Sequence, residues 1–207
     1  MRPRPMNRRY LTAIALAATA VALEARPKLE PVQAVDTEHT IFSSGGVVEL
    51  KDSAGDLRVE GWDRTEVELI VTKSAIEHVP GDIDRIIVEL ERPAADRLVI
   101  ITKQPLPRGA DVQLSYTIRI PRRTGLVIGH QRGNVRVRDV TGDMRVTNRS
   151  GRIELSLPRN ESYAIDAKAK SGRVASDQAL QQSASTPLAP LRLTLRVGTG
   201  NITLRAT

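Results

Sequence analysis

The chain has 207 residues, of which 40% are hydrophobic and only 2% aromatic, so one sizeable core must be built from aliphatic side chains. It contains no cysteine, which excludes a disulfide framework, a thiolate zinc site, a cysteine nucleophile and a lipid anchor on an N-terminal cysteine. The formal net charge of +7 is unevenly spread, because residues 23–107 carry 10 basic and 17 acidic side chains whereas residues 108–207 carry 17 basic and 7 acidic.

The first predicted element is a signal peptide over residues 1–25. Arg2, Arg4, Arg8 and Arg9 form its positive start, residues 11–23 are apolar to weakly polar, and small residues then offer cleavage sites. This apolar run is shorter than the about 20 residues that a membrane span requires, so cleavage is expected rather than an uncleaved anchor. The sequence therefore predicts an exported protein in the periplasm or at the cell surface, with a linker over residues 26–40.

One short pattern then repeats seven times: glycine, any residue, apolar, any residue, apolar. Six copies are complete, and the remaining copy has a serine in the last place. The copies begin at Gly46, Gly55, Gly133, Gly142, Gly151, Gly172 and Gly200. Three of them lie nine residues apart, which accommodates a strand of about five residues and a turn. Because one such step is too short for a complete solenoid coil, two or more steps are expected to make one rung, with a glycine at the same corner of each rung.

Alternating apolar residues predict further strands around residues 67–71, 86–90, 98–101, 111–120, 163–169 and 191–197. Loops are expected around residues 78–84 and 105–109 and over residues 179–190, and no window outside the signal peptide shows a helical period. We therefore predict an all-β fold of stacked short strands over residues 41–207. It would be a solenoid with a β-sandwich-like part on its N-terminal side and a candidate subdivision near residues 107–110.

Four segments carry a resemblance to a known family, namely residues 59–68, 150–153, 170–174 and 198–204. Over roughly residues 40–207 the chain resembles the bacterial putative-adhesin proteins of β-strand repeats, also called head-GIN or toastrack-like domains. The resemblance implies an exported all-β protein, partly a right-handed β-helix, that is associated with the cell envelope and sometimes found beside membrane-stress sensors. It implies no catalytic residues that could be carried over.

Side chains that usually carry catalysis or bind metals are scattered along the chain. His39, His78 and His130 lie far apart and have no partner at metal-ligand spacing, so we predict no metal, no cofactor and no catalytic residue. The nine-residue spacing also lacks the Gly-Gly-x-Gly-x-Asp pattern of calcium-binding β-rolls. Trp62 follows a repeat strand, where it would either cap the core or offer a platform for a sugar ring.

The basic half of the chain offers a candidate binding surface at Arg136, Arg138 and Arg145. Alternation places these side chains opposite the apolar ones, and rungs ~4.8 Å apart would stack them into a ladder. A ladder of this kind would suit an anionic envelope component or the acidic half of a second copy, unless Glu154 on the next repeat neutralises it. Nucleic acid is not expected as a partner, because there are few aromatic side chains on which bases could stack.

The sequence as a whole predicts a non-enzymatic, exported β-repeat protein that binds or scaffolds at the bacterial cell envelope, with a link to envelope-stress systems implied by the resemblance. The expected partners are anionic envelope components, another envelope protein or a second copy, and no transmembrane span is expected in the mature chain. The alternative is a lyase-like solenoid enzyme that acts on exported polysaccharide. That enzyme would need clustered acids, or an exposed arginine and lysine pair on one sheet.

Overall fold

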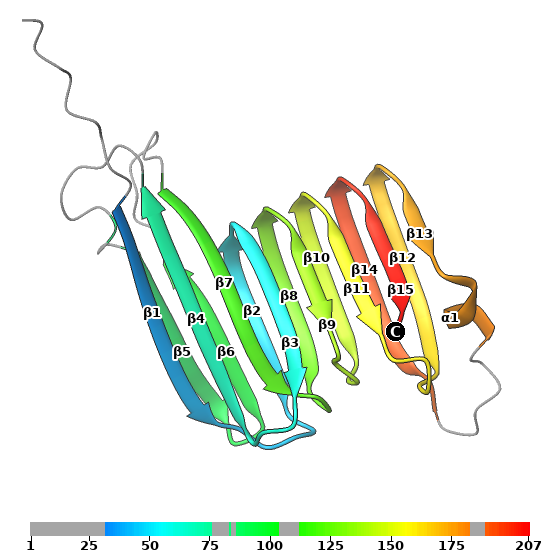
Figure 1. Ribbon diagram of the computed structural model, residues 1–207, viewed down its shortest axis with the longest axis horizontal. Coiled ribbons are helices and arrows are strands. Elements are labelled where there is room, and N and C mark those ends of the chain that lie inside the picture. Colours follow the sequence, from blue (N-terminus) through cyan, green and yellow to red (C-terminus); the bar gives the residue numbers. More distant parts are fainter. Residues whose placement is uncertain (1–31, 76–82, 84–85, 104–111, 183–188) are drawn as a thin grey trace, which may run out of the picture.

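The computed structural model describes residues 32–75, 83, 86–103, 112–182 and 189–207. The described elements are β1 (Val32–Ile41), β2 (Val47–Ala54), β3 (Asp56–Trp62), β4 (Glu66–Ala75), β5 (Ile87–Ala94), β6 (Arg97–Lys103), β7 (Val112–Pro121), β8 (Gly125–Arg132), β9 (Val135–Arg138), β10 (Met144–Ser150), β11 (Ile153–Leu157), β12 (Tyr163–Ser171), β13 (Val174–Ser176), α1 (Gln178–Gln182), β14 (Leu191–Thr199) and β15 (Ile202–Ala206). The strands form two sheets that face each other across one core (Figure 1). Sheet A has the order β1-β4-β7-β3-β9-β11-β15-β13, and sheet B has the order β12-β14-β10-β8-β2-β6-β5.

Most of the stack consists of rungs that contribute one strand to each sheet. Five consecutive pairs do so: β2 with β3, β8 with β9, β10 with β11, β12 with β13, and β14 with β15. Gly133, Gly142 and Gly151 precede β9, β10 and β11, which lie in sheets A, B and A. Two nine-residue steps therefore make one rung, and the predicted all-β stack of short strands is confirmed.

The last two rungs are exchanged in space relative to their order in the chain. The pair β14–β15 lies between β10–β11 and β12–β13, and its strands are parallel to their neighbours on both sides. The C-terminus consequently lies inside the stack (Figure 1), where the backbone N–H of Thr207 donates to the carbonyl of Leu157 at 2.9 Å.

The N-terminal end of the stack is antiparallel, as the sandwich-like prediction anticipated. In sheet A, β4 pairs antiparallel with β1 and with β7, and in sheet B, β5 pairs antiparallel with β6. The strand β7 also pairs with β3 and β8 pairs with β2, so the candidate boundary near residues 107–110 does not divide either sheet.

The strand β1 corrects the predicted linker over residues 26–40, because the chain enters sheet A at Val32. Ten consecutive residues of β1 pair with β4, yet the strand is mostly exposed, and Val35 and Ile41 are 55% and 77% exposed. Backbone hydrogen bonds hold this edge strand without a buried face, so it leaves no alternation in the sequence. The predicted signal peptide over residues 1–25 lies outside the described residues, as do the loops predicted around residues 78–84 and 105–109 for the most part.

Parallel register arranges the core in rows that run across the strands. On sheet A, Leu57 and Ile153 flank Val135, and Ile202 follows Ile153; all four are at most 1% exposed. On sheet B the matching row contains Val48, Leu126, Met144 and Leu193. Each fully buried aliphatic side chain contributes about 1.5–3 kcal/mol of transfer free energy, so these rows are what holds the two sheets together.

Five of the predicted turn glycines form a column at one corner of the stack. Gly55, Gly133, Gly151, Gly172 and Gly200 all have φ between +109° and +145°. A Cβ on Gly133, Gly151 or Gly200 would lie 2.0 Å from the carbonyl oxygen of the glycine on the preceding rung in the column. Glycine is therefore required at this corner both by the left-handed backbone and by the approach of the next rung.

Gly46 and Gly142 differ from the other predicted turn glycines, because neither has a left-handed φ. A Cβ on Gly142 would nevertheless lie 2.1 Å from the carbonyl oxygen of Thr124, and one on Gly46 would lie 2.6 Å from that of Asp96. Before β2 and β10, the strands that follow Gly46 and Gly142, the residue with a positive φ is Gly45 or Asp139 instead. These glycines are thus needed for space rather than for backbone conformation.

The helix α1 was not predicted and spans only five residues, with Leu180 buried against the end of the core. Its length is close to one turn, too short to leave a helical period in the sequence. No helix in the described ranges has the length and apolar character needed to cross a membrane.

Three alanine substitutions separate the two reasons for glycine. Gly45→Ala meets a left-handed φ of +89° with open space around the new Cβ, so we expect a loss of about 1–2 kcal/mol in the free energy of unfolding. Gly151→Ala adds the clash with the neighbouring rung, and we expect a loss of about 3–5 kcal/mol. Gly142→Ala tests the clash without the strained φ. Urea unfolding monitored by circular dichroism measures all three, and equal losses for Gly45→Ala and Gly151→Ala would contradict the role of rung contact.

Candidate functional site

The outer face of sheet A carries a row of side chains with alternating charge. Register brings Glu68, Arg119, Glu60 and Arg138 side by side on β4, β7, β3 and β9. Arg119 forms ion pairs with both glutamates, and Arg138 bonds Glu60 at 2.7 Å. At the edge, His39 on β1 lies 3.7 Å from Glu68. The row therefore contains a continuous ion-pair network that crosses four strands, β4, β7, β3 and β9.

A second row on the same face is less completely paired. Arg58 on β3 lies beside Arg136 on β9, and Arg136 bonds Glu154 on β11 at 3.2 Å. Arg58 forms no ion pair with any residue that the structure describes. Between the two rows is a shallow groove of about 270 Å³, lined by Arg58, Glu60, Arg136, Arg138, Glu154 and Ser156. The groove thus presents three guanidinium groups and two carboxylates.

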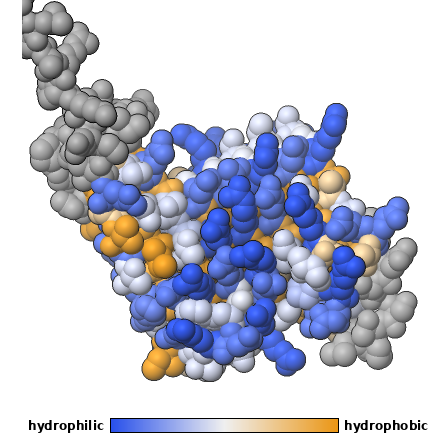
Figure 2. Space-filling view, in the orientation of Figure 1, coloured by the Kyte–Doolittle hydropathy of each residue, from blue (hydrophilic) through white to orange (hydrophobic). Residues whose placement is uncertain are grey.

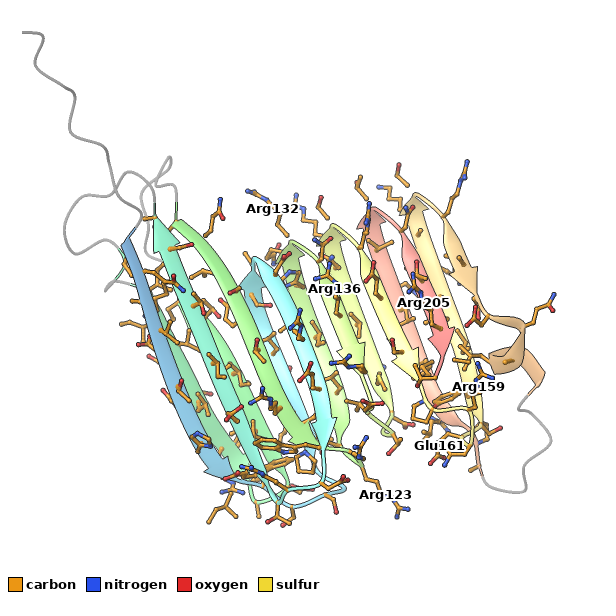
Figure 3. All side chains as sticks on the ribbon, in the orientation of Figure 1. Arg123, Arg132, Arg136, Arg159, Glu161 and Arg205 are labelled. Carbon is orange, nitrogen blue, oxygen red and sulfur yellow. The ribbon has the colours of Figure 1, made fainter. Side chains whose placement is uncertain are left out.

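This face is turned toward the viewer in Figure 1. Figure 2 shows that hydrophilic side chains cover most of it, while apolar surface appears at the end formed by β1. Figure 3 places Arg136 in the middle of the face and Arg205 closer to the C-terminal end of the stack. The second row therefore lies in the middle of the sheet, whereas the first row extends to the edge strand β1.

The structure brings two of the three predicted ladder residues together and separates the third. Arg136 and Arg138 share β9, but Arg145 lies on β10 in sheet B, where it is exposed on the opposite face of the stack. The prediction is wrong for Arg145 because strands one nine-residue step apart belong to different sheets. The neighbour weighed in the sequence, Glu154, does pair with Arg136, so the charge of this arginine is compensated within the row.

Arg58 and Glu60 belong to this site but were not predicted from the sequence. Both lie 78 residues before the arginines they adjoin, Arg136 and Arg138, and the register of β3 with β9 makes them neighbours. The signal was present in the repeat, because Arg58 and Arg136 each stand three residues after a corner glycine. Aligning the copy at Gly55 with the copy at Gly133 would have found them.

Trp62 caps the end of β3. Its indole N–H donates to the carbonyl of Glu66 at 2.8 Å, and the guanidinium of Arg64 lies 4.9 Å from the ring centroid. A cation this close to an aromatic ring is held by the ring quadrupole. A sugar would have to displace Arg64 from that side of the ring, so the geometry favours the capping role.

His130 and Ser53 form a pair that resembles a nucleophile and its base. The Ser53 hydroxyl lies 2.7 Å from Nδ1 of His130, and Nε2 lies 2.9 Å from the carbonyl oxygen of Gly55. A carbonyl only accepts, so Nε2 carries the proton and Nδ1 accepts from Ser53. Ser53 is fully buried and His130 is 3% exposed, so no substrate reaches the pair. Its role is to fix the corner between β2 and β3.

Burial lowers the pKa of His130, an effect opposed by the backbone carbonyls of Gly55 and Arg132 and by the charge of Asp56. The imidazole is thereby held neutral in the folded protein. Within the described part of the chain, no three His, Asp or Glu side chains gather closely enough to hold a metal ion.

Comparisons with known proteins agree with this architecture. The profile of a family described as Toastrack DUF4097 matches residues 32–190. A solved structure described as a putative cell adhesion protein, from Clostridium sporogenes ATCC 15579, is similar with a TM-score of 0.52 and 12% identity, covering 84% of this chain and 100% of that one. A putative adhesin from Bacteroides fragilis NCTC 9343 has a TM-score of 0.37 and 13% identity over 84% of this chain and 97% of that one. A search of curated proteins finds no match.

The buried histidine generates a pH prediction. Folding lowers the pKa of His130, so its contribution to the free energy of unfolding is fully present above the unfolded pKa of about 6.5. That contribution is lost as the pH falls below this value, by at most about 1.4 kcal/mol per pH unit. We expect His130→Gln to remove this part of the pH dependence between pH ~7.5 and ~5.5. Urea unfolding of both proteins across that range provides the measurement. Parallel curves for wild type and variant would show that another group titrates.

Proposed function

The chain belongs to the Toastrack DUF4097 family, and from this premise we propose that it is an exported, non-enzymatic module that binds or scaffolds other components at the bacterial cell envelope. The fold is shared with a solved protein described as a putative cell adhesion protein. The name of that protein supports an adhesin-like role here as part of the proposal.

The observation that carries the proposal is the fixed arrangement of charge on the outer face of sheet A. Neighbouring strands lie ~4.8 Å apart, and the glycine corner locks their register, so the groove residues keep a constant spacing. A partner whose charges match that spacing binds without first ordering the surface. Arg58 in particular is available to an anionic group of an envelope component or of another envelope protein.

Export and the envelope location rest on the predicted signal peptide over residues 1–25, and a link to envelope-stress systems rests on the family resemblance. A second copy is a further proposed partner, because the acidic N-terminal half of one copy would attract the basic C-terminal half of another. We propose the lyase-like enzyme as the second candidate, because sheet B does carry exposed arginine and lysine side chains, Arg149 and Lys170, on either side of Gly198.

Export with cleavage is tested on the protein secreted by the cells that make it. Mass spectrometry of the mature chain is expected to find an N-terminus near Val21, Leu23 or Arg26, because small residues precede these positions. A cytoplasmic species that retains Met1 would contradict the proposal.

Envelope binding is tested by retrieving partners from membrane and cell-wall fractions with the purified exported protein. We expect retention at low salt that weakens at high salt, because exposed charges are screened beyond ~8 Å at physiological ionic strength. Arg58→Gln with Arg136→Gln is expected to reduce the retained material roughly threefold to tenfold. Arg123→Gln with Arg132→Gln removes two charges from the rims of the stack (Figure 3) and serves as the matched control. Equal loss with both pairs would reject the groove as the binding surface.

A further inference from the structure

The outer face of sheet B is interrupted by two glycines at positions where neighbouring strands carry long side chains. Thr147 on β10 pairs with Gly129 on β8 and with Arg196 on β14. Gly198 on β14 falls between β10 and β12, next to Arg149 and Lys170. A Cβ on Gly198 would lie 2.5 Å from the carbonyl oxygen of Arg149, so the close packing of β10 against β14 keeps this position bare.

Each glycine opens a hollow whose floor is backbone. The hollow at Gly198 has a volume of about 640 Å³ and is rimmed by Arg149, Lys168, Lys170 and Arg196. The hollow at Gly129 has a volume of about 220 Å³ and is rimmed by Glu49, Lys51 and Arg145. Thr147 borders both hollows, so they lie side by side, and we call the two together the glycine groove.

The glycine groove is surrounded by more basic side chains than carboxylates. Six basic side chains and two carboxylates surround it: Lys51, Arg145, Arg149, Lys168, Lys170, Arg196, Glu49 and Asp166. Both carboxylates are already engaged. A hydrogen bond from Arg196 lowers the pKa of Asp166, and one from Arg97 lowers the pKa of Glu49, so both stay ionised and paired.

Three of the six cations have no ionic partner. Arg145, Arg149 and Lys170 form no ion pair with any part of the chain that the structure describes, and all three are exposed. This contrasts with the sheet A groove, where Arg136 and Arg138 are both paired with glutamates. An anionic ligand would therefore gain attraction in the glycine groove without first breaking an existing ion pair.

We propose that the glycine groove binds an anionic polysaccharide, a saccharide chain that carries a negative group at regular intervals. The glycines of the two hollows lie two strands apart across the sheet, ~9.5 Å, and two residues apart along the strands, ~6.6 Å, which separates them by ~12 Å. The ligand must therefore present repeated charges rather than a single one. The bare backbone at Gly129 and Gly198 lets a sugar ring approach closely. The groove has no aromatic lining for stacking nucleic acid bases, and a flat lipid surface does not enter a hollow.

This inference deepens the proposed function by naming a ligand class and a surface, and it rests on that function for its cellular setting. The probe is polygalacturonate, with neutral dextran as the uncharged control, in a titration of the full exported chain at low and high salt. We expect binding of polygalacturonate alone, weakened by salt because exposed charges are screened.

Arg149→Gln with Lys170→Gln is expected to lower the affinity for polygalacturonate roughly tenfold, since each exposed charge contact is modest. Arg159→Gln with Arg205→Gln removes the same charge from positions outside the groove (Figure 3) and is expected to leave the affinity unchanged. Thermal melting of the four single variants and the two double variants verifies that each is folded before its affinity for polygalacturonate is compared.

Several outcomes overturn the proposal. Binding that is unchanged in the groove pair, or reduced equally in the control pair, rejects the glycine groove as the site. Binding to phosphatidylglycerol vesicles in place of polygalacturonate assigns the cations to a lipid surface. Cleavage of polygalacturonate would reject the non-enzymatic function, whereas retention of envelope components without polygalacturonate binding would reject the groove alone and leave the proposed function standing.

Discussion

The structure depends on the close approach of neighbouring backbones at the glycine corner. Gly133 and Gly151 bring consecutive rungs near enough that no side chain fits between a Cα and the next carbonyl oxygen. The same corner is hydrogen-bonded from rung to rung, with the N–H of Gly133 donating to Ser150 and that of Gly151 donating to Thr199. Because five strands of sheet A, namely β3, β9, β11, β13 and β15, start from this fixed point, the register of each with the next is set, and the alternation of side chains inward and outward repeats without slippage.

Fixed register produces two outer faces of different electrostatic character from one repeat. On sheet A, acidic and basic side chains occupy neighbouring strands in the same row, so Arg138 and Glu60 satisfy each other. On sheet B the corresponding rows place Arg149 and Lys170 on either side of a glycine, and their charges remain uncompensated. A single architecture therefore presents one largely neutralised face and one cationic face, on opposite sides of a shared core.

The corner glycines and the alternating strands could be predicted from the sequence because each is a local pattern. Assignment of a strand to a sheet could not, and Arg145 was therefore placed on the wrong face. The pairing of β1 was invisible because backbone hydrogen bonds hold it, and Ser53 and His130 lie too far apart in sequence to suggest contact. In the site, Arg136 and its partner Glu154 were foreseen, whereas the contribution of β3 required the register across distant repeats.

The exchange of the last two rungs constrains how the chain is assembled. Residues of β14 and β15 leave the ribosome after those of β12 and β13, and these strands pair on both sides with strands made earlier. The rung formed by β12 and β13 must therefore wait, unattached to β10 and β11, until β14 and β15 fill the space between them. Growth of the stack is not a simple zipper from the N-terminus, and the loop closure that this demands makes completion of the C-terminal end a late event in folding.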